Sequence, residues 1–399
     1  TIKSGVLEID KAEKDFGGEV AVNLAGGELR INEDSKLGVV SLNGVGGVID
    51  TTGAKISTGV ISGAGSIQKK GSGTLVLTAN DYKGNTTISE GKVQISSSAA
   101  LGDGVNSKLV LDGGSLQVVQ AANAKIELAK NAVVTSSNGT VDVADGNVSL
   151  TGAVSGAGQL IKSGSGTFVL VNEKNTFEGG VRIKDGVLEV GGDGSLGKSG
   201  TKVLIDGATL AITKDAELKR QIVLTEKGGT VSVVAGGEAI LAGELALDSG
   251  VTSADFSKAG TGVLNLTQNN TQSNFKGDTF IKEGTLGINN QNNLAEGKLF
   301  LEGGNLRTNK SLNFDKDIIV NTTGGIDTAL DADGKNTTTV ASKIQGDGTF
   351  VKAGEGTLIL SADNIYAGGT QITGGALVVN NDSNLGLQAT DITLNGGTL

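Results

Sequence analysis

The sequence predicts an all-β protein of the solenoid type, in which short strands stack coil upon coil. Three observations lead to this prediction. Motifs recur about every 94 residues, apolar residues alternate with polar ones inside each motif, and the composition is rich in Gly and poor in bulky side chains. Together they argue against a set of ordinary globular domains, because no single repeat has enough large apolar residues to form its own core.

Composition sets the kind of core that is available. The 399 residues include 65 Gly but no Pro, Cys, His, Met or Trp, and only 3% are aromatic. Gly does not recur at every third position, which excludes collagen, and an apolar content of 37% is too high for a disordered chain. The core must therefore consist mainly of Val, Ile, Leu and Ala, which suit pleated strands.

Charge and missing residue types exclude several functions. A net charge of −10 repels phosphate backbones and anionic membrane surfaces, so nucleic acid is not an expected partner. The absence of Cys and His removes disulfides, thiolate chemistry, the commonest general base and the commonest metal ligand. We expect no enzyme activity, no cofactor, and no catalytic, cofactor-binding or metal-binding residues.

The clearest motif occurs in four copies and reads apolar-x-Lys-x-Gly-x-Gly-x-apolar-x-apolar. Its second Gly recurs at steps of 93, 96 and 94 residues. Within one copy Thr74 and Val76 are predicted to face outward and Leu75 and Leu77 inward, which is the period of a half-buried strand. The four copies are Ile67–Leu77, Leu160–Leu170, Phe256–Leu266 and Phe350–Leu360.

Two further motifs predict Gly-bounded strands at fixed places in each repeat. A Gly followed by an alternating strand occurs at Gly5–Ile9, Gly91–Ile95, Gly186–Val190, Gly284–Ile288 and Gly375–Val379. A Gly pair before a strand occurs at Leu24–Leu29, Leu111–Leu116, Leu301–Leu306 and Leu394–Leu399, with a degenerate copy at Ile205–Leu210. No helical periodicity separates these strands, so βαβ units are excluded and a sandwich array or a solenoid remains.

The solenoid is favoured over the sandwich array because the repeats lack Pro turns and a central Trp. At roughly 20 to 25 residues per coil the chain would make about 17 coils. We expect one continuous β-helix over residues 1–399, with a partial repeat at 1–60. The full repeats are expected at approximately 61–153, 154–249 and 250–343, and an incomplete one at 344–399.

The motifs resemble the autotransporter-associated β-strand repeat of bacterial surface proteins. The resemblance is strongest where an Asn-x-aromatic-x-Gly segment follows the Lys-containing motif, at Asn80–Gly84, Asn175–Gly179 and Asn364–Gly368. The third copy departs from it, because Ser273–Gly277 has its Asn one place nearer the aromatic residue. The resemblance implies a right-handed parallel β-helix passenger, exported across an outer membrane through a C-terminal β-barrel that is absent from this chain.

Gly-rich runs and aromatic positions are two kinds of candidate site. The Gly-x-Gly-Thr runs superficially resemble phosphate-binding loops, but they do not open helices and no Gly-Lys-Ser/Thr follows, so they are predicted to be turns. The aromatic residues of the slot, Tyr82, Phe177, Phe275 and Tyr366, could stack on sugars. The alternative is a structural role in which the ring covers the end of the core, and we predict that role.

Acidic positions are candidates for calcium binding and for glycoside cleavage. The irregular loop from Asp327 to Asn336 lacks the full oxygen pattern of a calcium site, and we predict a solvated turn. Asp112, Asp206 and Glu302 share one register, but they belong to different repeats about 20 Å apart, too far for a catalytic pair. Pairs of acids across neighbouring coils are left open by the sequence.

These observations favour a non-catalytic extracellular stalk or adhesive segment of a bacterial autotransporter-type surface protein. The expected location is the bacterial cell surface or the extracellular space. Expected partners are host or neighbouring-cell surface molecules, either protein or glycan, and self-association through coil ends. The alternatives are a structural filament or surface-layer component built by end-to-end stacking, and a glycan-cleaving β-helix enzyme.

The ends of the sequence lead to one more expectation. Leu29 and Leu399 occupy the same place in the repeat, and neither end has a recognisable polar cap. We expect an internal slice of a longer solenoid, or ends that are covered by neighbouring chains. The receptor and the residues that contact it are not identifiable from the pattern.

Overall fold

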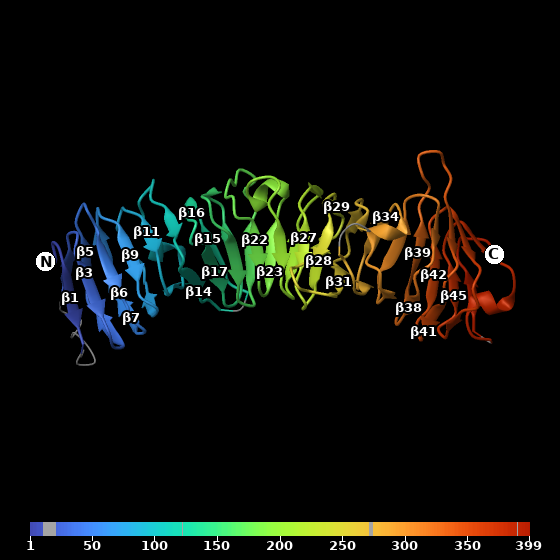
Figure 1. The fold of residues 1–399 in the computed structure, drawn as a ribbon, viewed down its shortest axis with the longest axis horizontal. Coiled ribbons are helices and arrows are strands. Elements are labelled where there is room, and N and C mark those ends of the chain that lie inside the picture. The colour runs from blue at the N-terminus through green and yellow to red at the C-terminus, as the bar shows by residue number, and fades with distance from the viewer. Residues whose placement is uncertain (11–20, 122, 271–273, 389) are drawn as a thin grey trace. The chain divides into compact units, whose positions relative to one another are not determined.

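The computed structural model describes residues 1–10, 21–121, 123–270, 274–388 and 390–399. Contacts divide the chain into two compact units, an N-terminal unit from Thr1 to Thr201 and a C-terminal unit from Lys202 to Leu399. Each unit is a parallel β-solenoid, and the strands are labelled in Figure 1. The chain makes about 18 turns, close to the predicted 17.

In the N-terminal unit two long sheets are accompanied by two shorter ones. The first sheet contains β1 (Val6–Ile9), β3 (Glu28–Ile31), β6 (Gly47–Asp50), β9 (Ile67–Lys70), β11 (Thr86–Ile88), β13 (Leu109–Leu111), β16 (Ala132–Val134) and β19 (Val154–Ser155). The second contains β4 (Ser35–Leu37), β7 (Lys55–Thr58), β10 (Thr74–Val76), β12 (Lys92–Ile95), β14 (Ser115–Val118), β17 (Gly139–Val143), β20 (Leu160–Ser163) and β22 (Val181–Ile183). The shorter sheets contain β2 (Val22–Leu24), β5 (Val40–Leu42) and β8 (Ile61–Gly63), and β15 (Lys125–Leu128), β18 (Asn147–Leu150), β21 (Thr167–Leu170) and β23 (Val187–Val190).

The C-terminal unit is built in the same way. Two of its sheets contain β24 (Val203–Ile205), β27 (Ile222–Leu224) and β30 (Leu245–Leu247), and β37 (Leu312–Phe314), β40 (Thr337–Val340), β43 (Thr357–Leu360) and β46 (Ala376–Val379). A third contains β25 (Thr209–Ile212), β28 (Gly229–Val233), β31 (Phe256–Ala259), β33 (Thr279–Ile281), β35 (Leu299–Leu301), β38 (Ile318–Val320), β41 (Ile344–Gly346) and β44 (Ile365–Tyr366). A fourth contains β26 (Ala216–Leu218), β29 (Glu238–Leu241), β32 (Val263–Leu266), β34 (Thr285–Ile288), β36 (Asn305–Thr308), β39 (Gly324–Thr328), β42 (Phe350–Ala353), β45 (Thr370–Ile372) and β47 (Ile392–Leu394).

Register pairing places like residues above one another. Leu29 pairs with Ile49, and Gly229 pairs with Phe256, so one coil takes roughly 20 to 27 residues. Strand β21 alternates between partly exposed and fully buried side chains, with Phe168 and Leu170 inward, as the period-two pattern predicts. The core is therefore a set of inward aliphatic rows, and the parallel all-β prediction is confirmed.

Within the described residues, helical structure consists of short 3-10 turns, and each repeat has one of them after its Gly-bounded strand. Those described are η1 (Ser98–Leu101), η2 (Asp193–Leu196), η4 (Gln291–Asn293) and η5 (Asp382–Leu385). Within the described ranges, no helix has the length and apolar character needed to cross a membrane.

The Gly-x-Gly runs form the tight turn between two strands of one coil, as predicted. Gly164 adopts a φ of +75°, and a Cβ there would lie 2.2 Å from the carbonyl oxygen of Val143 on the preceding coil. A side chain at this position would force the two coils apart. The runs do not open helices, and their carbonyl groups turn inward, as described below.

Candidate functional site: the repeated interior and the cavity beside Lys130

A lysine side chain enters the interior of the coil in each of the four repeats. Lys162 is 0% exposed, and its Nζ donates hydrogen bonds to the carbonyl oxygens of Ser163 (2.8 Å), Gly164 (2.6 Å) and Asp185 (3.1 Å). The last carbonyl belongs to the following coil, so the ammonium group ties two coils together. Lys69, Lys258 and Lys352 are at most 1% exposed and make the same set of bonds.

Burial makes these ammonium groups easier to deprotonate than exposed ones. Desolvation lowers the pKa of Lys162 to about 8, while the charges of Asp185 and Asp142 oppose this shift. At neutral pH the group is still mostly protonated and supplies three N–H donors for three carbonyl acceptors. The lysine therefore holds two coils together. All three of its N–H donors are used, and none is left for a ligand.

An asparagine bridges three successive coils in each repeat. Asn175 is 5% exposed, its Oδ1 accepts from the backbone N–H of Val154 (2.8 Å), and its Nδ2 donates to the carbonyl oxygen of Ser195 (2.8 Å). Asn80 and Asn364 make the equivalent pair of bonds. These asparagines replace strand hydrogen bonds at a corner where the backbone has no partner of its own.

The third repeat corrects one sequence assignment. Asn274 was expected to be the displaced copy of this asparagine, but Asn270 makes the two bridging bonds, to the N–H of Leu245 (3.1 Å) and the carbonyl of Asn293 (2.7 Å). Asn274 instead accepts from the N–H of Leu247 (2.9 Å). Ser273, the first residue of the expected motif, lies outside the described residues. Spacing alone misassigned the motif because additional residues separate the asparagine from its aromatic partner.

The aromatic slot is internal, as predicted. Tyr82, Phe177, Phe275 and Tyr366 are at most 2% exposed. The ring of Tyr366 packs against Phe350 with centroids 5.5 Å apart, and its hydroxyl lies 2.6 Å from Oγ1 of Thr370. Phe275 meets Phe256 edge to face at 6.4 Å. These rings close the core under the corner and present no face for sugar stacking.

The acids that share one register are separated and engaged with their neighbours. Asp112, in the N-terminal unit, accepts from Thr135 Oγ1 (2.5 Å). In the C-terminal unit Asp206 follows β24 and accepts from Thr225 Oγ1 (2.9 Å), whereas Glu302 follows β35 in another sheet and accepts from Asn321 (3.4 Å). The structure does not bring Asp206 and Glu302 together as a carboxylate pair.

The loop between β39 and β40 projects from its coil at the top of Figure 1, above the β39 label. The acids of this loop and Asp327 at the end of β39 do not converge on a common point. Asp327 pairs with Arg307 (2.7 Å), and Asp331 Oδ1 accepts from the backbone N–H groups of Asp333 (3.0 Å) and Lys335 (2.9 Å). Among the described residues, no group of three or more acids lies close enough to hold a metal ion.

One outward aromatic pair departs from the repeated plan. Phe280 on β33 pairs in register with Phe300 on β35, and their rings stack 4.5 Å apart with an interplanar angle of 14°. Because stacked rings on adjacent strands face each other, they offer edges to solvent and not faces. The pair braces two coils and is a poor platform for a sugar ring.

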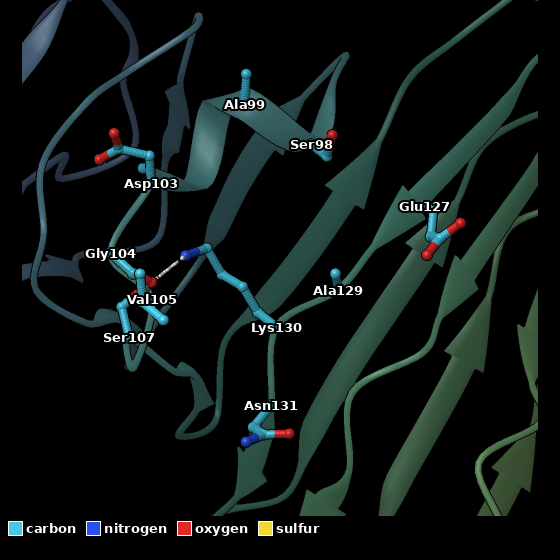
Figure 2. A pocket seen from close by; sticks show the side chains of 11 residues that line it. Ser98, Ala99, Asp103, Gly104, Val105, Ser107, Glu127, Ala129, Lys130 and Asn131 are labelled. Carbon is cyan, nitrogen blue, oxygen red and sulfur yellow. Dashed lines mark hydrogen bonds between the residues drawn. The ribbon is translucent and has the colours of Figure 1, made fainter.

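A cavity of about 410 Å³ lies on the surface of the N-terminal unit. Figure 2 shows the ammonium end of Lys130 directed at the loop that carries Gly104 and Ser107, with Asp103 and Glu127 on either side in this view. Lys130 Nζ donates to Ser107 Oγ (2.5 Å) and, at 3.4 Å, to the carbonyl of Gly104. The lining residues are Ser98, Ala99, Gly102, Asp103, Gly104, Val105, Ser107, Glu127, Ala129, Lys130 and Asn131.

The electrostatics of the cavity are mixed. Burial lowers the pKa of Lys130, and the nearby Asp103 opposes that shift. The hydrogen bond from Lys83 (2.6 Å) lowers the pKa of Asp103, so this carboxylate is ionised at neutral pH. No sequence motif marked this cavity, because its lining residues lie outside the repeated motifs.

A parallel β-solenoid whose interior lysine, asparagine and aromatic residue recur four times belongs to the class of repeat-built scaffolds. All of these interior residues lie inside the four segments that match the passenger-associated-transport-repeat, at residues 67–95, 160–190, 256–288 and 350–379. The chain therefore carries four copies of a repeat associated with autotransporter passengers, the proteins that its sequence resembles. Such a segment is located at the bacterial cell surface or outside the cell.

A curated relative supports the same assignment. The chain is 31% identical over 276 residues to the adhesin BmaC autotransporter of Brucella suis biovar 1 (strain 1330), over 61% of this chain. The match spans only 8% of the length of that relative. Comparison with solved structures gives no significant match.

Proposed function

We propose that this chain is a non-catalytic extracellular segment that acts as a stalk with an adhesive surface in an autotransporter-type surface protein. The observation that carries the proposal is the use of the repeated polar groups inside the coils. Lys162 and Asn175, like their equivalents, use their polar side-chain atoms for hydrogen bonds to backbone groups of their own and neighbouring coils. The repeated plan is thus scaffold, and contact with a partner is left to outward residues that do not recur.

The adhesive part of the proposal is supported by the name of the relative, which is an adhesin. Because the match spans 8% of that protein, adhesion is proposed for this chain and not transferred to it. The proposed partners are surface molecules of host or neighbouring cells, either protein or glycan. The proposed organisation is a continuous β-helix with repeats at approximately 61–153, 154–249, 250–343 and 344–399.

Adhesion of chain-coated beads to cultured cells tests the proposal. Beads carrying the 399-residue chain are expected to bind cells well above albumin-coated beads, and soluble chain should compete. Binding no greater than with albumin would contradict the adhesive role. Filaments that lengthen with concentration in micrographs would favour a structural filament instead, and release of reducing ends from a polysaccharide panel would favour an enzyme.

A further inference from the structure

We propose that the cavity beside Lys130 binds a neutral oligosaccharide through its hydroxyl groups. This inference rests on the proposed adhesive function and names a ligand class for it. The carboxylates of Asp103 and Glu127 can accept hydrogen bonds from sugar hydroxyls, and the Lys130 ammonium can donate one. The volume of about 410 Å³ lies within the range of small-molecule sites.

Polar capacity is left over inside the cavity. Lys130 Nζ has three N–H donors but makes one short bond, to Ser107, and one long bond, to Gly104, among the described residues. Asn131 uses its Oδ1 to accept from the N–H of Ala153 (2.9 Å), and within the described ranges its amide N–H₂ makes no hydrogen bond. Asn131 is exposed and Lys130 is half-buried, so a ligand that offers both donors and acceptors would replace water at these groups.

The charges favour a neutral ligand over an anionic one. An anion beside Lys130 would also face the carboxylates of Asp103 and Glu127, and it would approach a chain of net charge −10. A cation would meet the Lys130 ammonium and Lys83, which already pairs with Asp103 at 2.6 Å. A hydroxyl-rich, uncharged molecule avoids both repulsions.

The cavity is separate from the repeated scaffold. It lies outside the segments that match the passenger repeat, and its loop, residues 102–108, is longer than the loops at the equivalent place, 197–202, 294–298 and 386–391. Val105 in this loop is 98% exposed. The non-repeating residues on this coil thus gather around one concave site.

The test uses the full chain and a printed array of neutral oligosaccharides (chitotriose, lactose, mannotriose) and acidic ones (sialyllactose, a heparin tetrasaccharide). The strongest neutral binder is then titrated by calorimetry. Ala129→Trp fills the cavity from an exposed position directly after β15, and Ala341→Trp is the matched control directly after β40. Glu127→Gln removes a charge while keeping an acceptor for Thr151 Oγ1.

We expect binding to neutral glycans, at least about tenfold weaker in Ala129→Trp and unchanged in Ala341→Trp. Glu127→Gln should weaken binding about threefold or more, because one charge-assisted hydrogen bond is lost. Circular dichroism and the urea midpoint check that each variant folds, and Glu127→Gln decides the question if Ala129→Trp does not.

Binding only to acidic glycans, no glycan binding, or full binding in both Ala129→Trp and Glu127→Gln would overturn the inference. The bead assay separates this inference from the proposed function. If beads carrying Ala129→Trp or Glu127→Gln adhere as well as wild-type beads, the cavity is not the adhesive site, but the adhesive function itself is not contradicted. If wild-type beads do not adhere, the proposed adhesive function itself is contradicted.

Discussion

Replacing the bridging asparagine of the second repeat tests whether these side chains hold the coils together. Asn175→Ala removes an acceptor from the N–H of Val154 and a donor from the carbonyl of Ser195. Val154 begins β19, Ser195 lies in the 3-10 turn η2, and both residues are buried. The substitution leaves them buried and unpaired.

The expected cost follows from those two groups. Each unpaired buried group costs about 1–3 kcal/mol, so Asn175→Ala should destabilise its coils by about 2–6 kcal/mol. Because each coil contacts mainly its neighbours, the effect should be concentrated on the coils that carry Val154, Asn175 and Ser195. Peptides from the fourth repeat should be unaffected.

Hydrogen exchange followed by mass spectrometry measures this locally. Peptides covering Val154 and Ser195 should exchange at least about thirtyfold faster in Asn175→Ala than in wild type. Asn106→Ala is the control, because Asn106 is exposed and makes no side-chain hydrogen bond in the described part of the chain. Exchange within about threefold of wild type in Asn175→Ala would refute the bridging role.

Asn175→Asp adds a test with a definite sign. The carboxylate still accepts from Val154, but it faces the carbonyl oxygen of Ser195 without a donor, so its pKa in the folded state should be raised. A raised folded pKa gives stability at low pH that is lost as pH rises through that value. The urea midpoint of Asn175→Asp should thus approach that of wild type near pH 4.5 and fall below it at pH 7.5. An equal deficit at both pH values would contradict this reasoning.

Three further outcomes are expected. Burial lowers the pKa of Lys162 from 10.5 to about 8, so between these values the unfolded chain binds more protons and stability rises with pH. Lys162 alone contributes a gain of about 2 kcal/mol between pH 7.5 and 9.5 in urea unfolding, and Lys162→Met should remove that contribution and leave those of the other three buried lysines. Gly164→Ala should cost about 2 kcal/mol or more in the same assay, whereas Gly53→Ala, with a similar φ of +76° but open space around its Cβ, should cost about 1 kcal/mol. Equal losses would show that crowding by Val143 is irrelevant. Phe177→Ala should lose about 3–5 kcal/mol and Phe177→Leu less than about 1.5 kcal/mol, and a similar small loss for both would place the ring outside the core.

Much of the fold was predictable because the same sequence pattern recurs in every repeat. The alternation of Thr74, Leu75 and Val76 specifies one inward face, and parallel stacking then places the same face of each later coil on the same row. The burial of the aromatic slot was predictable for a similar reason. The same ring position recurs beside a turn in each repeat, and there the ring can cover the end of the core. Four copies made each of these inferences stronger than one could be.

The lysine clamp was missed although the same alternation contains it. Counting from Leu160 puts Lys162 inward, but a charged residue facing the core contradicts the usual expectation that lysine is exposed. Its position is acceptable only because three carbonyl groups converge there, and that convergence depends on the turn at Gly164 and on the next coil. Asn270 was missed because an inserted stretch shifted the spacing. The cavity beside Lys130 was not predictable, since it forms between loops of two coils.

In the stacked coils of this chain, inward residues determine stability, and outward residues are free to determine what the surface binds. An inward substitution at Lys162 or Asn175 unpairs backbone groups on a neighbouring coil, so the interior tolerates little change. An outward residue such as Val105 contacts solvent, and its replacement costs the stack almost nothing. Loops at coil corners can therefore vary in length and chemistry while the register beneath them stays fixed. A binding surface on such a scaffold should be found where the corner loops differ between repeats, and residues 102–108 are one such loop.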